Sequence, residues 1–186
     1  MARTRKTMMG WVTGGCLLVA GVVAFAWIAG QTRTGFLHIH TSIEINANKD
    51  AVWAVLADFA AYREWNPLMI EVRAESKPGA RMDWSSRLKG TVREYNAQID
   101  RALEGRELTW TGPVSGLLRI VFWGQHRFTI EDIDGGRVRL TNAEWFGGLL
   151  TPFIASFLKN DVREAYDEAN AALKRRVESR QIGKSR

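Results

Sequence analysis

The sequence feature that most constrains the fold is a series of segments with alternating apolar and polar residues, followed by one long helical stripe. The first segment covers residues 36–46, and the others lie between residues 70 and 146. Alternation with a period of two is typical of strands that bury one face. From about residue 152 onward, apolar residues recur at helical spacing instead. This order predicts an α+β fold in which a curved antiparallel sheet of about seven strands wraps around a long C-terminal helix.

Two short helices are expected between the first strand and the rest of the sheet. Asn48 is a typical helix-capping residue, and Val52 and Val55 follow it at helical spacing. A second short helix is expected over residues 60–65. It must end before Pro67, because the residue that precedes a proline is disfavoured in the helical conformation.

The last two predicted strands allow a pairing register to be derived. They cover residues 120–133 and 137–146, and the apolar side chains of both strands lie mostly at even positions. Buried faces of paired strands must coincide, and the numbers of paired residues in an antiparallel hairpin have a constant sum. A three-residue loop over residues 134–136 satisfies both conditions and places Ile133 opposite Arg137. The same register pairs His126 with Glu144 and Phe128 with Asn142.

This register directs three polar side chains, His126, Asn142 and Glu144, toward the interior of the sheet. A buried carboxylate costs several kcal/mol unless it is paired, so a hydrogen bond between His126 and Glu144 is expected. Three interpretations remain open. The pair could fix the strand register, form the polar end of an apolar pocket that orients an amphipathic ligand, or act as a general acid/base pair.

A curved sheet closed by one helix often leaves a cavity that side chains fill or line. Aromatic side chains at inward-facing strand positions are the candidates for lining it, although most buried aromatic residues simply pack in the core. Gly147 and Gly148 would permit the loop before the last helix to shift. The expected ligand-binding residues are Trp84, Trp110, Phe122, His126, Phe128, Asn142 and Glu144, and the expected rim residues are Tyr62, Trp65 and Met69.

The charge distribution excludes one class of function. The formal net charge is +6, but residues 7–173 carry 17 basic and 19 acidic groups, so the excess lies at the two ends of the chain. A folded domain that grips nucleic acid needs its positive charge on the folded surface, and none is expected here. The basic C-terminal end either complements the helix dipole or contacts an acidic membrane surface.

No metal or cofactor is expected. Cys16 is the only cysteine, which excludes an internal disulfide and a cysteine-based zinc site. Two of the three histidines, His38 and His40, lie on the polar face of the first strand, so they are interpreted as solvated side chains.

The N-terminal region contains a candidate membrane segment. Residues 8–30 carry no charge, follow a short basic flank, and match the length of about 20 residues that a helix needs to cross a bilayer. The flanking charges favour a single-pass anchor with the N-terminus in the cytoplasm and the domain outside. The alternative is a signal peptide cleaved near Ala26, followed by secretion. The expected division of the chain is 1–7 basic flank, 8–30 membrane segment, 31–35 linker, 36–178 domain and 179–186 basic tail.

The order of the elements and several local motifs resemble a known superfamily. The motifs are Val52-Trp53 with Asp58, Tyr62 and Trp65-Asn66-Pro67; Gly105 with Leu108-Thr109-Trp110; and His126-Arg127-Phe128 with Gly135-Gly136, Glu144 and Phe146-Gly147-Gly148. Together they resemble the helix-grip fold of the START-related, birch-pollen-allergen-like (SRPBCC) superfamily, in its polyketide cyclase/dehydrase and lipid-transport branch. The resemblance implies ligand carriage, cyclisation or dehydration, or an oxygenase partner domain, without one shared catalytic set.

Three functions therefore remain open. The first is membrane-tethered binding of a hydrophobic or amphipathic small molecule, including a lipid, in the cavity between the sheet and the helix. The second is a cyclase- or dehydratase-type enzyme that uses His126 and Glu144. The third is an interaction domain whose cavity is filled by its own side chains.

Overall fold

The computed structural model of the chain describes residues 17, 20–22, 24 and 37–184. Within the predicted membrane segment, residues 8–30, only positions 17, 20–22 and 24 are described. The predicted basic flank and linker on either side of this segment lie outside the described residues. Among the residues that are described, no helix combines the length and the apolar character needed to cross a bilayer.

The elements follow the predicted order, with one additional helix. Their bounds are β1 (Leu37–Ile45), α2 (Lys49–Leu56), the 3₁₀ turn η1 (Phe59–Ala61), α3 (Tyr62–Trp65), β2 (Met69–Arg73), β3 (Arg81–Leu88), β4 (Thr91–Leu103), β5 (Glu107–Gly112), α4 (Gly116–Val121), β6 (Trp123–Ile133), β7 (Arg137–Gly147), α5 (Thr151–Phe157), the π-helical turn η2 (Leu158–Val162) and α6 (Arg163–Lys184).

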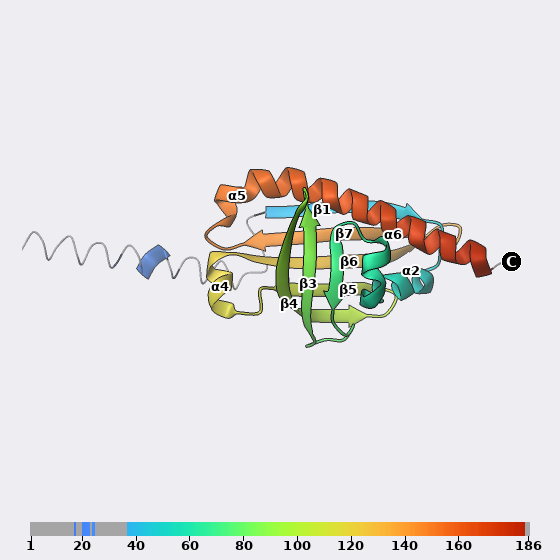
Figure 1. Cartoon of the computed structure of the whole chain (residues 1–186), viewed down its shortest axis with the longest axis horizontal. Helices are drawn as coiled ribbons and strands as arrows, with labels where there is room; N and C mark the ends of the chain where they lie inside the picture. Colours follow the sequence, from blue (N-terminus) through green and yellow to red (C-terminus); the bar gives the residue numbers. More distant parts are fainter. Residues whose placement is uncertain (1–16, 18–19, 23, 25–36, 185–186) are drawn as a thin grey trace, which may run out of the picture.

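The seven strands form one antiparallel sheet in the order β1-β7-β6-β5-β4-β3-β2. The sheet is strongly bent: β2, β3 and β4 run across the direction of the other four strands, and α5 to α6 form one long helix along the sheet (Figure 1). The register between β4 and β5 is irregular between Ile99 and Arg101, and such bulges increase the local bend of a strand. The architecture is the predicted helix-grip fold.

The derived register of the last hairpin is confirmed. Ile133 pairs with Arg137, and the further pairs are His126 with Glu144 and Phe128 with Asn142. Gly135 and Gly136 in the connecting loop have φ angles of +77° and +72°, which glycine adopts without steric cost.

The predicted limits of the first helices are also confirmed. The Asn48 side-chain oxygen accepts a hydrogen bond of 2.9 Å from the backbone nitrogen of Ala51, which caps α2. The short helix α3 ends at Trp65, two residues before Pro67. The Asn66 side chain then accepts hydrogen bonds from the backbone nitrogens of Leu68 and Met69 and directs the chain into β2.

Residues 116–121 correct the prediction. They form the helix α4, so the strand begins at Trp123 and not at Ile120. A short apolar run does not distinguish strand from helix by its period alone. The backbone carbonyls of Ile120 and Val121 accept hydrogen bonds of 3.0 and 2.9 Å from the nitrogens of Leu149 and Leu150, so the end of α4 is held by a loop distant in sequence.

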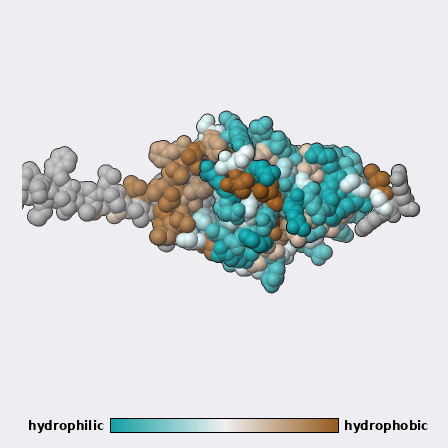
Figure 2. Space-filling view, viewed as in Figure 1, coloured by the Kyte–Doolittle hydropathy of each residue, from teal (hydrophilic) through white to brown (hydrophobic). Residues whose placement is uncertain are grey.

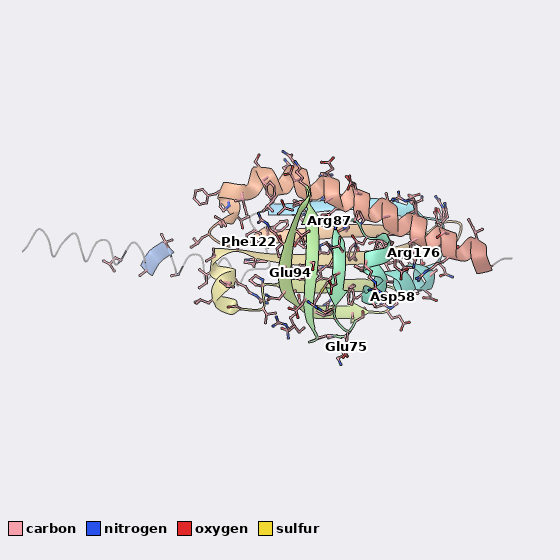
Figure 3. All side chains as sticks on the ribbon, in the orientation of Figure 1. Asp58, Glu75, Arg87, Glu94, Phe122 and Arg176 are labelled. Atoms are coloured by element: carbon pink, nitrogen blue, oxygen red, sulfur yellow. The ribbon has the colours of Figure 1, made fainter. Side chains whose placement is uncertain are left out.

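The C-terminal helix also extends beyond the prediction. The sequence assigns residues 179–186 to a basic tail outside the domain, yet α6 continues to Lys184. Near its end, Arg176 forms an ion pair with Glu64, and Arg180 lies 4.0 Å from Asp58. Figure 3 shows Arg176 and Asp58 at this end of the molecule, and contacts of this kind tie the helix to the region after α2.

Candidate functional site

The concave face of the sheet encloses a cavity of about 570 Å³. Its walls come from β2 to β7, from α4, and from the long helix around η2. The volume lies in the range of about 300–1,000 Å³ that is typical of small-molecule sites. Apolar side chains dominate the lining, among them Met69, Trp84, Trp110, Phe122 and Leu158.

One part of the cavity wall carries a polar pair. His126 Nδ1 lies 3.6 Å from a carboxylate oxygen of Glu144, and both side chains are largely buried. This distance exceeds that of a hydrogen bond, so the predicted hydrogen bond is not formed. The His126 ring instead stacks on Trp110, with ring centres 4.4 Å apart and planes at 3°.

The second nitrogen of the His126 ring has unused bonding capacity. His126 Nε2 is buried and has no hydrogen-bond partner among the described residues. Since His126 lines the cavity, a polar group of a bound molecule could satisfy a nitrogen that the protein leaves unpaired.

Gly124 makes room for the carboxylate of this pair. A Cβ atom built at Gly124 would lie 2.5 Å from Glu144 Oε1, so any larger residue would displace that side chain. Gly124 itself lines the cavity beside Glu144. The close approach of strand and carboxylate therefore helps to define where the negative charge sits.

The structure brings most of the predicted site residues together, but not all of them. Phe128 packs in the main core cluster, which also contains Leu173 of α6. Asn142 points inward as derived, but its amide donates to Asn170 at 3.1 Å, and Asn170 donates to Thr41 at 2.7 Å. The predicted residues that line the cavity are Met69, Trp84, Trp110, Phe122, His126 and Glu144.

The predicted rim residues Tyr62 and Trp65 do not line the cavity. Tyr62 is fully buried, and its hydroxyl donates a 2.6 Å hydrogen bond to the backbone carbonyl of Leu56. Burial, with a smaller contribution from Asp58, raises the pKa of the Tyr62 phenol far above its usual range. Trp65 packs against the same core cluster and does not line the cavity.

The buried Tyr62 hydroxyl leads to a first testable prediction. Tyr62→Phe should lower the free energy of unfolding by about 1–2 kcal/mol, because the Leu56 carbonyl loses its buried donor. Tyr95→Phe is the matched control, since the Tyr95 side chain is exposed, and it should change stability by less than about 0.5 kcal/mol. Equal urea midpoints for the two variants would contradict this role of Tyr62.

Several lining residues were missed. Leu118 and Val121 belong to α4, a helix that the alternating pattern did not indicate. Tyr166 lies one turn after Val162 on the predicted apolar stripe, so its helical spacing could have identified it. Lys89 in the β3–β4 turn forms a 2.6 Å ion pair with Asp161 of η2, which links two walls of the cavity across a sequence distance that no local pattern reveals.

The two glycines after β7 are explained by packing. A Cβ atom at Gly147 would lie 2.3 Å from the indole ring of Trp123. Gly148 has a φ angle of +100°, and its added Cβ would lie 2.6 Å from the backbone oxygen of Val121. Both positions therefore need glycine because neighbouring atoms approach too closely for a side chain. The two glycines are explained without a loop that shifts.

The part of the chain that is described contains no evident metal site. No group of three or more histidine, cysteine, aspartate or glutamate side chains there could hold a metal ion. His38 and His40 are exposed on β1, as expected, and the His38 ring stacks on Trp145 with ring centres 4.5 Å apart.

Comparisons with solved structures support the fold. An aromatase/cyclase, Zhui, from a Streptomyces species is 18% identical with a TM-score of 0.64, covering 77% of this chain and 94% of its own. A START superfamily protein from Mycobacterium smegmatis is 17% identical with a TM-score of 0.63, covering 76% and 97%. Norcoclaurine synthase from Thalictrum flavum is 12% identical with a TM-score of 0.60, covering 81% and 99%.

Similarities at this level of identity establish a shared fold. No curated protein matches the sequence. Residues 37–178, however, match the sequence model of the family described as "Polyketide cyclase / dehydrase and lipid transport", which covers most of the chain. By its sequence and by its helix-grip fold, the chain belongs to this family.

Proposed function

We propose that the domain binds a hydrophobic or amphipathic small molecule, including a lipid, in the cavity of about 570 Å³. The observation that carries the proposal is the composition of the cavity wall, which is mainly apolar and holds one largely buried polar pair, His126 and Glu144. The other charged residues of the wall, such as Arg93 and Glu94 of β4, are exposed. A site of this kind holds the apolar part of a ligand by burial and orients it through few polar contacts. An unfilled cavity of this size also weighs against a domain whose interior is packed solid.

The polar pair would determine which end of the ligand enters first. His126 Nε2 and the Glu144 carboxylate both offer bonding capacity at the cavity wall. A hydroxyl or amide group placed there would gain hydrogen bonds, whereas a purely apolar group would leave buried polar atoms unsatisfied. An amphipathic ligand with its polar group toward His126 therefore fits best.

Blocking the cavity provides the direct test. Ser86→Trp places an indole at a cavity-lining position of β3 and should weaken binding of the hydrophobic dye anilinonaphthalene sulfonate by about tenfold or more, because the apolar volume is occupied. Dye titration and native mass spectrometry of co-purified ligand give the measurement.

Ser42→Trp is the matched control, since Ser42 lies exposed on β1. It should bind the dye as the unmodified protein does. Undiminished dye binding by Ser86→Trp would exclude the cavity as the site.

The membrane tether is part of the same proposal. The uncharged stretch of residues 8–30 supports a single-pass anchor with the N-terminus in the cytoplasm and the domain outside, the alternative being secretion after cleavage near Ala26. Alkaline carbonate extraction of membranes that contain the full chain distinguishes the two. An anchored chain stays in the membrane pellet with its N-terminus intact, and a cleaved chain is released and starts after the cleavage site.

An enzymatic function is the second candidate, favoured by the unpaired Nε2 of His126, whose other ring nitrogen, Nδ1, lies 3.6 Å from the Glu144 carboxylate. Two proteins of similar fold are, by name, an aromatase/cyclase and a synthase. His126→Gln keeps hydrogen-bonding capacity but cannot exchange a proton near neutral pH. Catalysis would be supported by a compound that the unmodified protein converts and that the His126→Gln variant binds but does not convert. Carriage would be supported by a compound that both proteins bind and neither converts.

A further inference from the structure

One end of the domain exposes an unusual set of large apolar side chains. We define the apolar end face by Leu117, Leu118 and Val121 of α4, Leu149 and Leu150 of the loop between β7 and α5, and Phe153 and Phe157 of α5. Phe153 is 85% exposed and Leu117 is 77% exposed. Figure 2 shows apolar surface gathered at this end, over α4 and α5.

The apolar end face is continuous. The backbone hydrogen bonds from Leu149 and Leu150 to the end of α4 hold its two halves together. Charged residues are nearly absent: residues 113–122 include only Arg119, and residues 147–158 include none. Exposed patches of this kind mark interaction sites, because solvent exposure of clustered large apolar side chains is unfavourable.

The same face borders the opening of the cavity. Leu118, Val121 and Phe157 are exposed on the end face and also line the cavity. Phe122, labelled in Figure 3 at this end of the molecule, continues the lining inward. A ligand that crosses this edge therefore meets the apolar side chains of α4 and α5.

The domain is joined to the proposed anchor at this end. Leu37, the first residue of β1, pairs with Phe146 at the end of β7. Like Phe122, it also packs against the small cluster that includes Leu158. Residues 31–36 separate Leu37 from the uncharged stretch, and six residues span at most about 20 Å. The tether would therefore hold the end face close to the bilayer surface.

From this arrangement we propose that the apolar end face docks on the lipid bilayer, with Leu117 and Phe153 inserted at the interface and the cavity opening directed toward the lipid. The inference rests on the proposed function, because it uses both the tether and the ligand cavity. Three charged residues lie beside the face in the sequence, Arg119, Lys159 and Asp161. Asp161 forms an ion pair with Lys89, so the charges left to meet an anionic lipid surface are basic. Lipid molecules could then enter the cavity without crossing water.

The proposal also assigns a different role to the basic C-terminal end. Figure 1 places the end of α6 opposite α4 and α5, so it would point away from a bilayer that contacts the end face. The basic side chains there also have protein partners, such as Glu64 for Arg176. They stabilise the helix end in this arrangement and do not contact the same lipid surface.

Site-specific quenching tests the docking in the full chain. Cys16→Ser removes the native thiol, and Phe153→Cys then carries an environment-sensitive fluorophore in vesicles of phosphatidylcholine and phosphatidylglycerol. Lipids with a nitroxide in the acyl chain should quench this probe by about half. The reason is that a docked end face would lie about 5–10 Å deep, at the boundary between headgroups and acyl chains, as other interfacial segments do. Ile182→Cys is the matched control, since Ile182 is also an exposed apolar residue of a helix, at the opposite end.

The outcomes separate docking from the proposed function. Strong quenching at residue 153 with little at residue 182 supports docking, whereas equally weak quenching at both overturns it. Disulfide formation between copies at residue 153 in unlabelled protein would assign the face to a second chain and also overturn the proposal. Native mass spectrometry of ligand co-purified with the same variants reports on the cavity independently, so docking can fail while ligand binding persists. Release by alkaline carbonate would instead identify failure of the tether.

Discussion

Replacing Gly148 by alanine should lower the free energy of unfolding by about 2–5 kcal/mol, through backbone strain and overpacking together. At a φ angle of +100° an L-amino acid is strained, and the added Cβ would lie 2.6 Å from the backbone oxygen of Val121. A backbone atom cannot rotate away as a side chain does, so either α4 or the following loop must move. Urea unfolding followed by tryptophan fluorescence measures the loss.

Gly136→Ala is the matched control for this substitution. Gly136 also has a positive φ angle, +72°, but an added Cβ there meets no atom within 4 Å. It should cost only the backbone strain, about 1 kcal/mol. If both variants lose the same stability, the close approach between the Gly148 loop and α4 does not contribute, and the end face is held less firmly than the structure indicates.

Replacing Trp110 by alanine is expected to lower the free energy of unfolding by about 3–5 kcal/mol. Trp110 is 3% exposed at the centre of the concave face, and it stacks on His126 and contacts Phe128. Its removal leaves a void beside the ligand cavity and deprives His126 of its stacking partner. Thermal and urea unfolding should both report the change.

Trp145→Ala is the comparison for Trp110→Ala. Trp145 lies on the outer face of β7, half-buried, where it stacks on His38 and lies 4.9 Å from the Arg127 guanidinium carbon. Contacts of this kind at exposed sites contribute about 0.5–1 kcal/mol each, so the loss should be less than half of that at Trp110. A loss at Trp145 as large as that at Trp110 would contradict the assignment of Trp110 to the core.

The fold could be predicted to the level of strand register. The period-two segments and the helical stripe are local properties of the chain, and a three-residue loop leaves one register that matches the two buried faces. The pairing of His126 with Glu144 followed from this reasoning and is present in the sheet. In a hairpin with a known loop, the residue opposite a given residue is found by counting along the two strands, so predicting this pair required no knowledge of tertiary contacts.

The distance between these two side chains could not be predicted in the same way. The register brings the backbones together, but the stacking of His126 on Trp110 and the space left at Gly124 set the side-chain positions. The hydrogen bond expected from the cost of burying a carboxylate is therefore absent, and Nδ1 and the carboxylate oxygen remain 3.6 Å apart.

The limits of the cavity were the least predictable feature. Asn142 and Phe128 lie on the inward face of the sheet as expected, but Asn142 bonds to Asn170 of α6 and Phe128 belongs to the core cluster that contains Leu173. Tyr62 belongs to a helix after β1 and carries an amphipathic ring typical of a rim, yet it is fully buried in the core. Which inward-facing residues meet a ligand depends on where the helix crosses the sheet.

What the uneven charge of the chain implies also depends on the fold. Composition alone suggests a basic protein, whereas its distribution separates a nearly neutral domain from two basic ends. The folded arrangement adds that the C-terminal end lies opposite the apolar end face and is partly paired with acidic groups of the domain. Surface position, and not the sum of charges, then decides which end can meet a membrane.

The sequence by itself determined the order of the elements, the inward face and the register of the last two strands, and the presence of an uncharged N-terminal stretch. These are set by side-chain periodicity, capping residues and turn residues, which act over a few positions. Only the tertiary structure decided that residues 116–121 form a helix, that the cavity remains open beside His126, and that large apolar side chains gather around its opening. Those features arise where segments distant in sequence approach within a few ångströms, and no local pattern encodes that approach.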